Sequence, residues 1–121
     1  MPSRRLVSVI VPTHNRAKDL LDAVQSLSLQ DYPALEIVVI DNRSTDGTRD
    51  VLEGLALHEP RLRHLYEDQP GVNVARNRGC LEAAGDLLAF LDDDEVAPPD
   101  WLTRLVASMD ETSADGIGGP Y

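Results

Sequence analysis

The chain has 121 residues, the length of one ordinary domain, and we expect residues 1–121 to form a single unit. Its 42% hydrophobic and 26% charged residues are typical of a folded globular protein and exclude a disordered chain. The formal net charge of −10 disfavours nucleic acid as a partner, because an acidic surface repels the phosphate backbone.

Four apolar segments rich in β-branched residues predict strands, and the segments that follow them carry apolar residues at helical spacing. In chain order the expected elements are strand 6–11, helix 16–30, strand 35–41, helix 43–57, strand 61–67, helix 71–86, strand 87–92 and helix 98–109, with a further strand beginning within 116–121. Proline is expected in the first turn of the last helix, where its missing N–H costs nothing.

Helical spacing also predicts which side chains face the core. In the first helix the expected inward residues are Leu20, Leu21, Val24 and Leu27. In the third helix they are Val74, Cys80, Leu81 and Ala84. Because Cys80 is the single cysteine, an internal disulfide and a cysteine metal site are both excluded.

Strands that alternate with helices through short loops predict an α/β fold with a mostly parallel sheet and right-handed crossovers. In such sheets ligands bind outside the carboxyl ends of the strands, where the strand order reverses. Three expected strand ends carry unusual polar runs: "PTHNR" at 12–16, "DNRSTDGT" at 41–48 and "DDDE" at 92–95. We therefore expect the functional residues in these three runs.

The run of Asp92, Asp93, Asp94 and Glu95 is the strongest of the three signals. Adjacent carboxylates raise one another's pKa unless a cation is present, and such hard oxygen ligands suit Mg²⁺ or Mn²⁺. If the strand continued through them, Asp92 and Asp94 would point to one side and Asp93 to the other. The alternative is a solvated turn before a helix, where acids are favoured near the N-terminus. We favour ligand binding.

The second run has the spacing of a calcium-binding helix-loop-helix loop. The matching positions are Asn42, Ser44, Asp46, Gly47 and Glu53. A strand rather than a helix precedes them, so we favour Ser44 or Asp46 as the cap of the following helix. Asp41 is left at a strand end, where nucleoside-binding folds place an acid that hydrogen-bonds the sugar or the base.

The remaining polar residues each have two interpretations. His14 could stack on a base or, with Asn15, cap the helix that follows, and from the residues alone we favour capping. Arg76, near the start of the third helix, could reach a phosphate or form a surface ion pair worth under about 1 kcal/mol. For Arg76 we favour the phosphate.

Taken together, "VSVIVPTHNR", "EIVVIDNRSTDGT" and "ARNRGCLEAAGDLLAFLDDDEVAPPDWL" resemble the nucleotide-binding part of a family 2 glycosyltransferase with the GT-A fold. The resemblance covers nearly the whole chain. In that family the acidic run is a D-x-D type motif. The resemblance implies that Asp93 contacts the donor ribose, that Asp94 ligates a divalent metal on the donor diphosphate, and that Asp92 completes the motif and the metal site.

The same resemblance assigns the other side of the nucleotide. It implies that Pro12 and His14 line the base pocket with Asn15 beside them, although tyrosine is common at the position of His14. It implies that Asp41 hydrogen-bonds the base. It also implies that Arg76 and Asn77 lie beside the nucleotide.

The implied reaction is an inverting transfer of a sugar from a nucleoside diphosphate, for which we favour a UDP-linked donor, to a saccharide, lipid or other hydroxyl acceptor, with Mg²⁺ or Mn²⁺ as cofactor. Complete family members continue into an acceptor-binding half that supplies the general base, so we expect that base beyond Tyr121. The alternatives are a noncatalytic nucleotide-sugar-binding module, a purely structural interaction domain, and a sugar nucleotidyltransferase. The last is disfavoured because "PTHNRAKD" lacks a glycine-rich phosphate loop.

No apolar run approaches the roughly 20 residues that a membrane span needs. We therefore expect a cytoplasmic location, at the inner face of a membrane if the chain belongs to a longer parent. Any membrane association would then come from parts outside this sequence.

Overall fold

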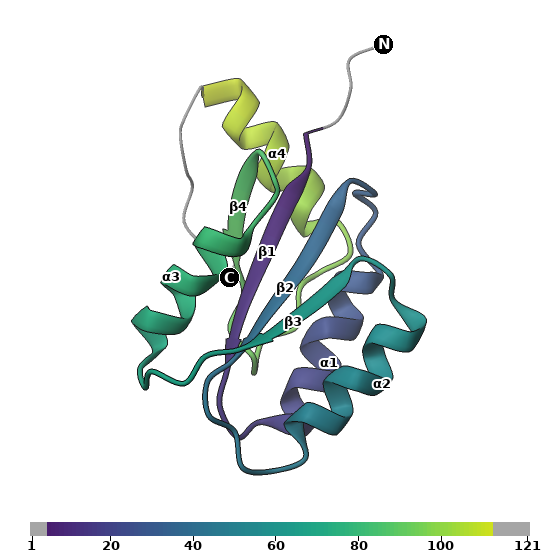
Figure 1. Cartoon of the computed structure of the whole chain (residues 1–121). Coiled ribbons are helices and arrows are strands. Elements are labelled where there is room, and N and C mark those ends of the chain that lie inside the picture. Colours follow the sequence, from purple (N-terminus) through teal and green to yellow (C-terminus); the bar gives the residue numbers. More distant parts are fainter. Residues whose placement is uncertain (1–4, 113–121) are drawn as a thin grey trace.

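Strands and helices alternate along the chain in a computed structural model that describes residues 5–112 (Figure 1). The strands are β1 (Val7–Thr13), β2 (Leu35–Asp41), β3 (Leu62–Tyr66) and β4 (Leu87–Phe90). The helices are α1 (Ala17–Ser28), α2 (Thr48–His58), α3 (Val72–Glu82) and α4 (Trp101–Thr112). Within 5–112, no helix has the length and apolar character needed to cross a membrane.

The four strands form one parallel sheet in the order β3-β2-β1-β4, which confirms the α/β prediction. The chain adds β2 and β3 on one side of β1 and then returns to add β4 on the other side. Because crossovers are right-handed, this reversal moves the connecting helix to the opposite face. Accordingly α3 lies across the sheet from α1 and α2 in Figure 1. The switch point lies between β1 and β4.

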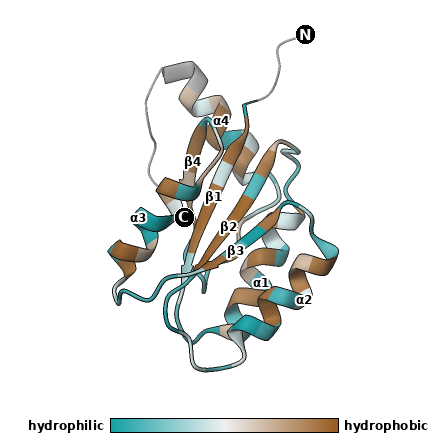
Figure 2. Ribbon diagram, in the orientation of Figure 1, coloured by the Kyte–Doolittle hydropathy of each residue, from teal (hydrophilic) through white to brown (hydrophobic). Residues whose placement is uncertain are grey.

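Each face of the sheet has its own core, as the two-residue period of a strand requires. On one face Val9 and Val11 of β1 pack with α1, α2 and α4, from which Leu20, Leu52 and Trp101 are buried. On the other face Ile10 packs with Val38 and Ile40 of β2 and with Ala75 of α3. The hydrophobic colour follows β1 and β2, while the loops at their carboxyl ends are hydrophilic (Figure 2).

The inward face of α3 differs from the sequence prediction. Its buried residues are Ala75 and Gly79, whereas Cys80 and Ala84 are exposed and Leu81 is 83% exposed. The cause is the close approach of the helix to β1, since a Cβ on Gly79 would lie 2.4 Å from Cγ2 of Ile10. The prediction was wrong because it looked for large apolar side chains where the packing requires small ones.

Several boundaries also differ. The third helix ends at Glu82 rather than continuing to residue 86, and β4 ends at Phe90, before the acidic run. The last helix begins at Trp101, so the prolines at 98 and 99 precede it instead of lying in its first turn. In α1, Leu21 is 36% exposed rather than inward. The strand expected within 116–121 lies outside the described residues.

Candidate functional site

A cleft of about 440 Å³ opens at the carboxyl ends of β1 and β4, at the switch point of the sheet. Its lining comes from three places. Strand β1 and its following loop contribute Pro12, Thr13, His14 and Arg16, helix α3 contributes Val72, Ala75 and Arg76, and the run after β4 contributes Asp92, Asp93 and Asp94. Asn42, which follows β2, completes the lining. All three polar runs identified in the sequence therefore contribute to this cleft, the second of them through Asn42 alone.

Residues 92–95, called here the acid turn, form a turn rather than the continuation of a strand. The Asp92 backbone N–H donates to Oε1 of Glu95 at 3.2 Å, and the Glu95 N–H donates to the Asp92 carbonyl at 3.1 Å. Glu95 therefore closes the turn instead of lining the cleft. The strand alternation from which Asp92 and Asp94 were expected to point to one side does not apply, because the chain has already left β4 at Phe90.

Asp93 is the buried member of the acid turn, at 9% exposure. Its Oδ2 accepts a hydrogen bond of 2.8 Å from the hydroxyl of Thr13, and its Oδ1 lies 3.6 Å from Nε of Arg16. Burial raises the pKa of Asp93 above its ordinary value, and the Thr13 hydroxyl, the His14 backbone N–H and Arg16 oppose that rise. Asp93 is thus held in one orientation at the floor of the cleft.

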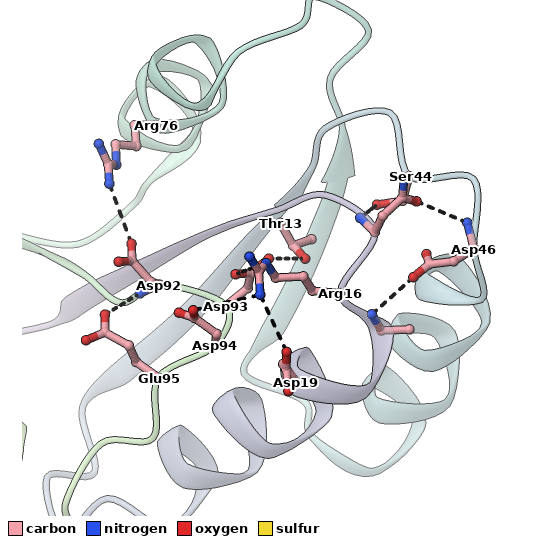
Figure 3. Close-up of polar contacts among 12 residues, drawn as sticks. Thr13, Arg16, Asp19, Ser44, Asp46, Arg76, Asp92, Asp93, Asp94 and Glu95 are labelled. Atoms are coloured by element: carbon pink, nitrogen blue, oxygen red, sulfur yellow. Dashed lines mark hydrogen bonds and ion pairs between the residues drawn. The ribbon is translucent and has the colours of Figure 1, made fainter.

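Asp92 and Asp94 are half-exposed and pair with arginines from opposite walls of the cleft. Nη2 of Arg76 lies 3.5 Å from Asp92, and Nη1 of Arg16 lies 3.8 Å from Asp94. Figure 3 shows Arg76 extending from α3 toward Asp92, with Arg16 on the other side of the turn. The like charges of the acid turn are therefore partly offset by two guanidinium groups.

The carboxylates of the cleft are suited to a divalent metal whose coordination shell is completed by a bound ligand. Among residues 5–112 no three His, Cys, Asp or Glu side chains are grouped as a metal site. Asp92 and Asp94 nevertheless present hard oxygen atoms to the cleft, where cationic groups already lie against them. Mg²⁺ commonly takes one or two carboxylates and completes its shell with waters and substrate phosphates. Two carboxylates suit that arrangement.

Asn15 joins the loop after β1 to the loop after β2. Its Oδ1 accepts hydrogen bonds from the backbone N–H groups of Thr45 at 2.7 Å and Asp46 at 3.2 Å, and its own N–H donates to Oγ of Ser44 at 2.9 Å. The favoured prediction that His14 and Asn15 cap α1 is wrong, since the N-cap residue is Arg16 and it makes no side-chain cap bond. The side chain of Asn15 is used for this link between loops.

Asp46 stabilises the starts of two helices. Its Oδ1 accepts from the N–H of Thr48, the first residue of α2, at 3.0 Å. Its Oδ2 accepts from the N–H of Ala17, the first residue of α1, at 3.2 Å. The N-cap residue of α2 is Gly47, so Asp46 stabilises the start of the helix from one position earlier, whereas Ser44 receives the Asn15 N–H instead.

The ring of His14 is oriented by a neighbouring backbone carbonyl. Its Nδ1 lies 2.6 Å from the carbonyl oxygen of Asn42, which assigns the proton to Nδ1. Nε2 is then an acceptor, and the side-chain amide of Asn15 lies 3.3 Å from it. The ring is exposed at the rim of the cleft, with a fixed tautomer.

Asn42 was not singled out from the sequence as part of the site, yet it organises one wall of the cleft. Its Nδ2 donates to the carbonyls of Glu67 at 3.0 Å and Gln69 at 2.7 Å, and its Oδ1 accepts from the N–H of Gly71 at 3.0 Å. These bonds tie the end of β2 to the loop that enters α3. Thr13 and Arg16 lie within the "PTHNR" run, but the sequence assigned no individual role to either of them.

Three residues assigned by the resemblance lie outside the main cleft. Asp41 is buried, and its Oδ1 accepts from the Ser44 N–H at 3.1 Å. Asn77 is exposed on α3, and Asn15 lines a second hollow beside the starts of α1 and α2. Of the nine assigned residues, the cleft brings together Pro12, His14, Arg76 and the three aspartates.

The cleft lies at the switch point of the parallel sheet, which is where α/β domains of this kind bind their ligands. The family model for glycosyl transferase family 2 matches residues 8–121, and the chain belongs to that family. The solved structures that resemble this chain agree with the expected GT-A fold.

Individual relatives agree with the family assignment. Glycosyltransferase AglE of Haloferax volcanii is 37% identical over 116 residues, which are 93% of this chain and 38% of AglE. Mannosyltransferase PcManGT from Pyrobaculum calidifontis, solved with GDP-Man and Mn²⁺, has a TM-score of 0.83 at 34% identity, covering 88% of this chain and 33% of that one. S. aureus TarS 1–349 with UDP-GlcNAc has a TM-score of 0.79 at 30% identity, covering 96% and 37%. This chain thus spans between a third and two fifths of each of these proteins.

Proposed function

We propose that this chain is the donor-binding part of an inverting glycosyltransferase that moves a sugar from a nucleoside diphosphate to an acceptor hydroxyl. The observation that carries the proposal is the acid turn, whose three aspartates face Arg16 and Arg76 across a cleft at the switch point. A cleft that carries both positive and negative side chains can bind a ligand that combines an anionic diphosphate with neutral sugar hydroxyls. The family to which the chain belongs, and the GDP-Man and UDP-GlcNAc in two similar solved structures, support the same ligand class.

In this proposal each side chain has a task that its contacts suit. Asp93, held by Thr13, accepts hydrogen bonds from ribose hydroxyls. Arg76 donates to phosphate oxygens once it leaves Asp92, and the exposed ring of His14 offers a face to the base. Asp94 and Asp92 would hold Mg²⁺ or Mn²⁺, which supplies positive charge to the leaving diphosphate.

The chemistry of an inverting transfer needs one more group. The acceptor hydroxyl attacks the anomeric carbon from the face opposite the diphosphate, and a general base removes its proton. Glu95 closes the acid turn and Asp100 pairs with Arg104 at 3.1 Å, so neither is assigned this task. In this proposal the base and the binding site for the acceptor, a saccharide, a lipid or another hydroxyl compound, are assigned to no residue among 5–112.

The noncatalytic alternative shares the donor site and differs only in turnover. It is kept because the chain spans 38% or less of the relatives described above. Release of nucleoside diphosphate with an acceptor or with water would identify an enzyme, and saturable binding without release would identify a binding module.

A thermal-shift panel tests the shared donor site. UDP, GDP, UDP-GlcNAc and GDP-Man are each added with Mn²⁺, with Mg²⁺ or with a chelator. A ligand at a hundred times its Kd should raise the stability by about 2.7 kcal/mol. We expect the largest metal-dependent shift with the uridine compounds. No metal-dependent shift with any nucleotide would overturn the proposal.

A further inference from the structure

Arg16 is the cation of the cleft to which neither the resemblance nor the proposed function gives a task. Its guanidinium lies among three carboxylates: Nε is 3.6 Å from Asp93, and Nη1 is 3.8 Å from Asp94 and 3.7 Å from Asp19. Two of these acids belong to the acid turn, and the third lies in the first turn of α1. Figure 3 shows Arg16 between them.

The contacts of Arg16 are loose. All three separations exceed the range of about 2.7–3.2 Å for an N–H···O hydrogen bond, so charge rather than directed bonding holds the group in place. Its side chain is 51% exposed, so it is in contact with water and has room to adopt other rotamers. Ion pairs of this kind are weak, and a stronger cation can replace them.

Without Arg16 and without a bound ligand, the carboxylates of the acid turn would repel one another with no cation between them. Asp93 is buried and directly precedes Asp94, so two carboxylates lie next to each other and the first has little water around it. Arg16 is the group that faces both of them. Arg16 therefore already places a positive charge against the carboxylate of Asp94, to which the proposed function assigns the metal.

We propose that Arg16 is a built-in, displaceable counter-cation of the acid turn, which a divalent metal must displace to reach Asp94. The inference rests on the proposed function, because it assumes that Asp94 is a metal ligand. Asp19 lies outside the acid turn and already contacts the same Nη1, so it keeps the displaced guanidinium paired. Arg16 thus weakens the binding of metal alone and makes metal binding depend on the oxygen ligands that the donor diphosphate adds.

A titration of the chain with Mn²⁺ in the absence of nucleotide tests this. Arg16→Gln removes the competing charge and keeps a polar, although shorter, side chain, so Mn²⁺ should bind roughly tenfold more tightly than to the wild type. Lys18→Gln is the matched control, because it removes the same charge from an exposed residue of α1 that lies outside the cleft. It should change the affinity by less than about twofold, since exposed charges farther away are screened.

Thermal unfolding provides a second readout that does not depend on activity. Without metal, Arg16→Gln should unfold at a lower temperature than the wild type, because Asp93 and Asp94 have lost their shared cation. Added Mn²⁺ should raise the unfolding temperature of Arg16→Gln by more than that of the wild type. The same curves show that the variant is folded.

The outcomes separate the inference from the function on which it rests. If the wild type binds UDP with Mn²⁺ but Arg16→Gln binds Mn²⁺ no more tightly, the counter-cation role is overturned and the donor site stands. If Lys18→Gln increases the affinity for Mn²⁺ as much as Arg16→Gln does, the effect comes from net charge, and the counter-cation role of Arg16 is again overturned. Failure of all variants to bind Mn²⁺, with or without UDP, would overturn the metal site and the inference together.

Discussion

The hydroxyl of Thr13, the last residue of β1, donates a hydrogen bond of 2.8 Å to Oδ2 of Asp93 in the acid turn after β4. It links the two strand ends that border the switch point. Thr13→Val should destabilise the fold by about 1–3 kcal/mol at neutral pH, because a buried carboxylate loses its donor. Thr13→Ser keeps the hydroxyl and should cost less. Urea unfolding measures both, and equal losses would contradict the assignment.

The effect of Thr13→Val should depend on pH with a definite sign. The folded-state pKa of Asp93 is raised, so its stabilising contribution is complete below the unfolded value of about 3.8 and falls as pH rises through the folded pKa. The Thr13 hydroxyl offsets part of that fall by bonding the ionised form. The destabilisation by Thr13→Val should therefore be larger at pH 7 than at pH 3. A pH-independent difference would show that the bond does not act on the charged carboxylate.

Gly79 tests the close approach of α3 to β1. Gly79→Ala should destabilise the protein by about 1–3 kcal/mol, because the added Cβ would lie 2.4 Å from Ile10 and force the helix to shift. Gly54→Ala is the matched control in α2, where a Cβ meets nothing within 4 Å, and it should stabilise by about 0.5–1 kcal/mol. Denaturant unfolding of the two variants decides this, and equal effects would contradict the packing described for α3.

Gly79 also shows where the sequence was informative and where it was not. Strand and helix order, the parallel sheet and the acidic cleft at a strand end were predictable, because apolar periodicity and strand-end polarity depend on local sequence. The inward face of α3 was not, because it depends on the distance between the helix and Ile10. Large apolar side chains such as Leu81 were expected inside, yet at that distance only small ones fit.

The candidate site was predictable to a similar extent. The acid turn and Arg76 were found from residue type and position alone, and the structure brings both into one cleft. The roles of Asn15 and Asn42 were not, since each bonds backbone groups of a loop about 30 residues away, such as Thr45 for Asn15 and Gly71 for Asn42. Such pairings arise only when the strands align their ends.

We expect Asn15 to link the two loops through the hydrogen bonds of its side chain rather than through its backbone conformation. Its φ of 52° lies in the left-handed region, which glycine adopts easily. Asn15→Ala should destabilise by about 0.5–1.5 kcal/mol, because two exposed backbone N–H groups lose their protein acceptor. Asn15→Gly separates the causes, since it relieves the backbone but also lacks the acceptor. Near wild-type stability of Asn15→Gly in thermal unfolding would sink this explanation.

Glu59 predicts a loss of stability in acid. Hydrogen bonds from Arg61, the closest at 2.7 Å, lower the pKa of Glu59 from 4.5 to about 2, and Arg61 also donates to the Ser28 carbonyl near the end of α1. A lowered folded-state pKa gives stability that is complete above 4.5 and is lost as pH falls toward 2. The shift corresponds to on the order of 3 kcal/mol.

Glu59→Gln should therefore flatten the pH dependence of the unfolding free energy between about 4.5 and 2. Glu53 is the control, because it is 62% exposed and lies 4.0 Å from Arg49. Glu53→Gln should change the stability by less than about 0.5 kcal/mol and leave the pH profile as it was. Chemical unfolding at a series of pH values measures both variants. An unchanged slope in Glu59→Gln would contradict the assigned role of Arg61.

The most direct test of the proposed donor site is calorimetric titration of UDP into the chain with Mn²⁺ or with a chelator. Asp94→Asn is compared with Asp22→Asn, which removes the same charge from an exposed position on α1 outside the cleft. We predict metal-dependent binding by the wild type and by Asp22→Asn, and at least roughly tenfold weaker binding by Asp94→Asn. Binding of UDP that is equal with and without metal, or unchanged in Asp94→Asn, would contradict the account.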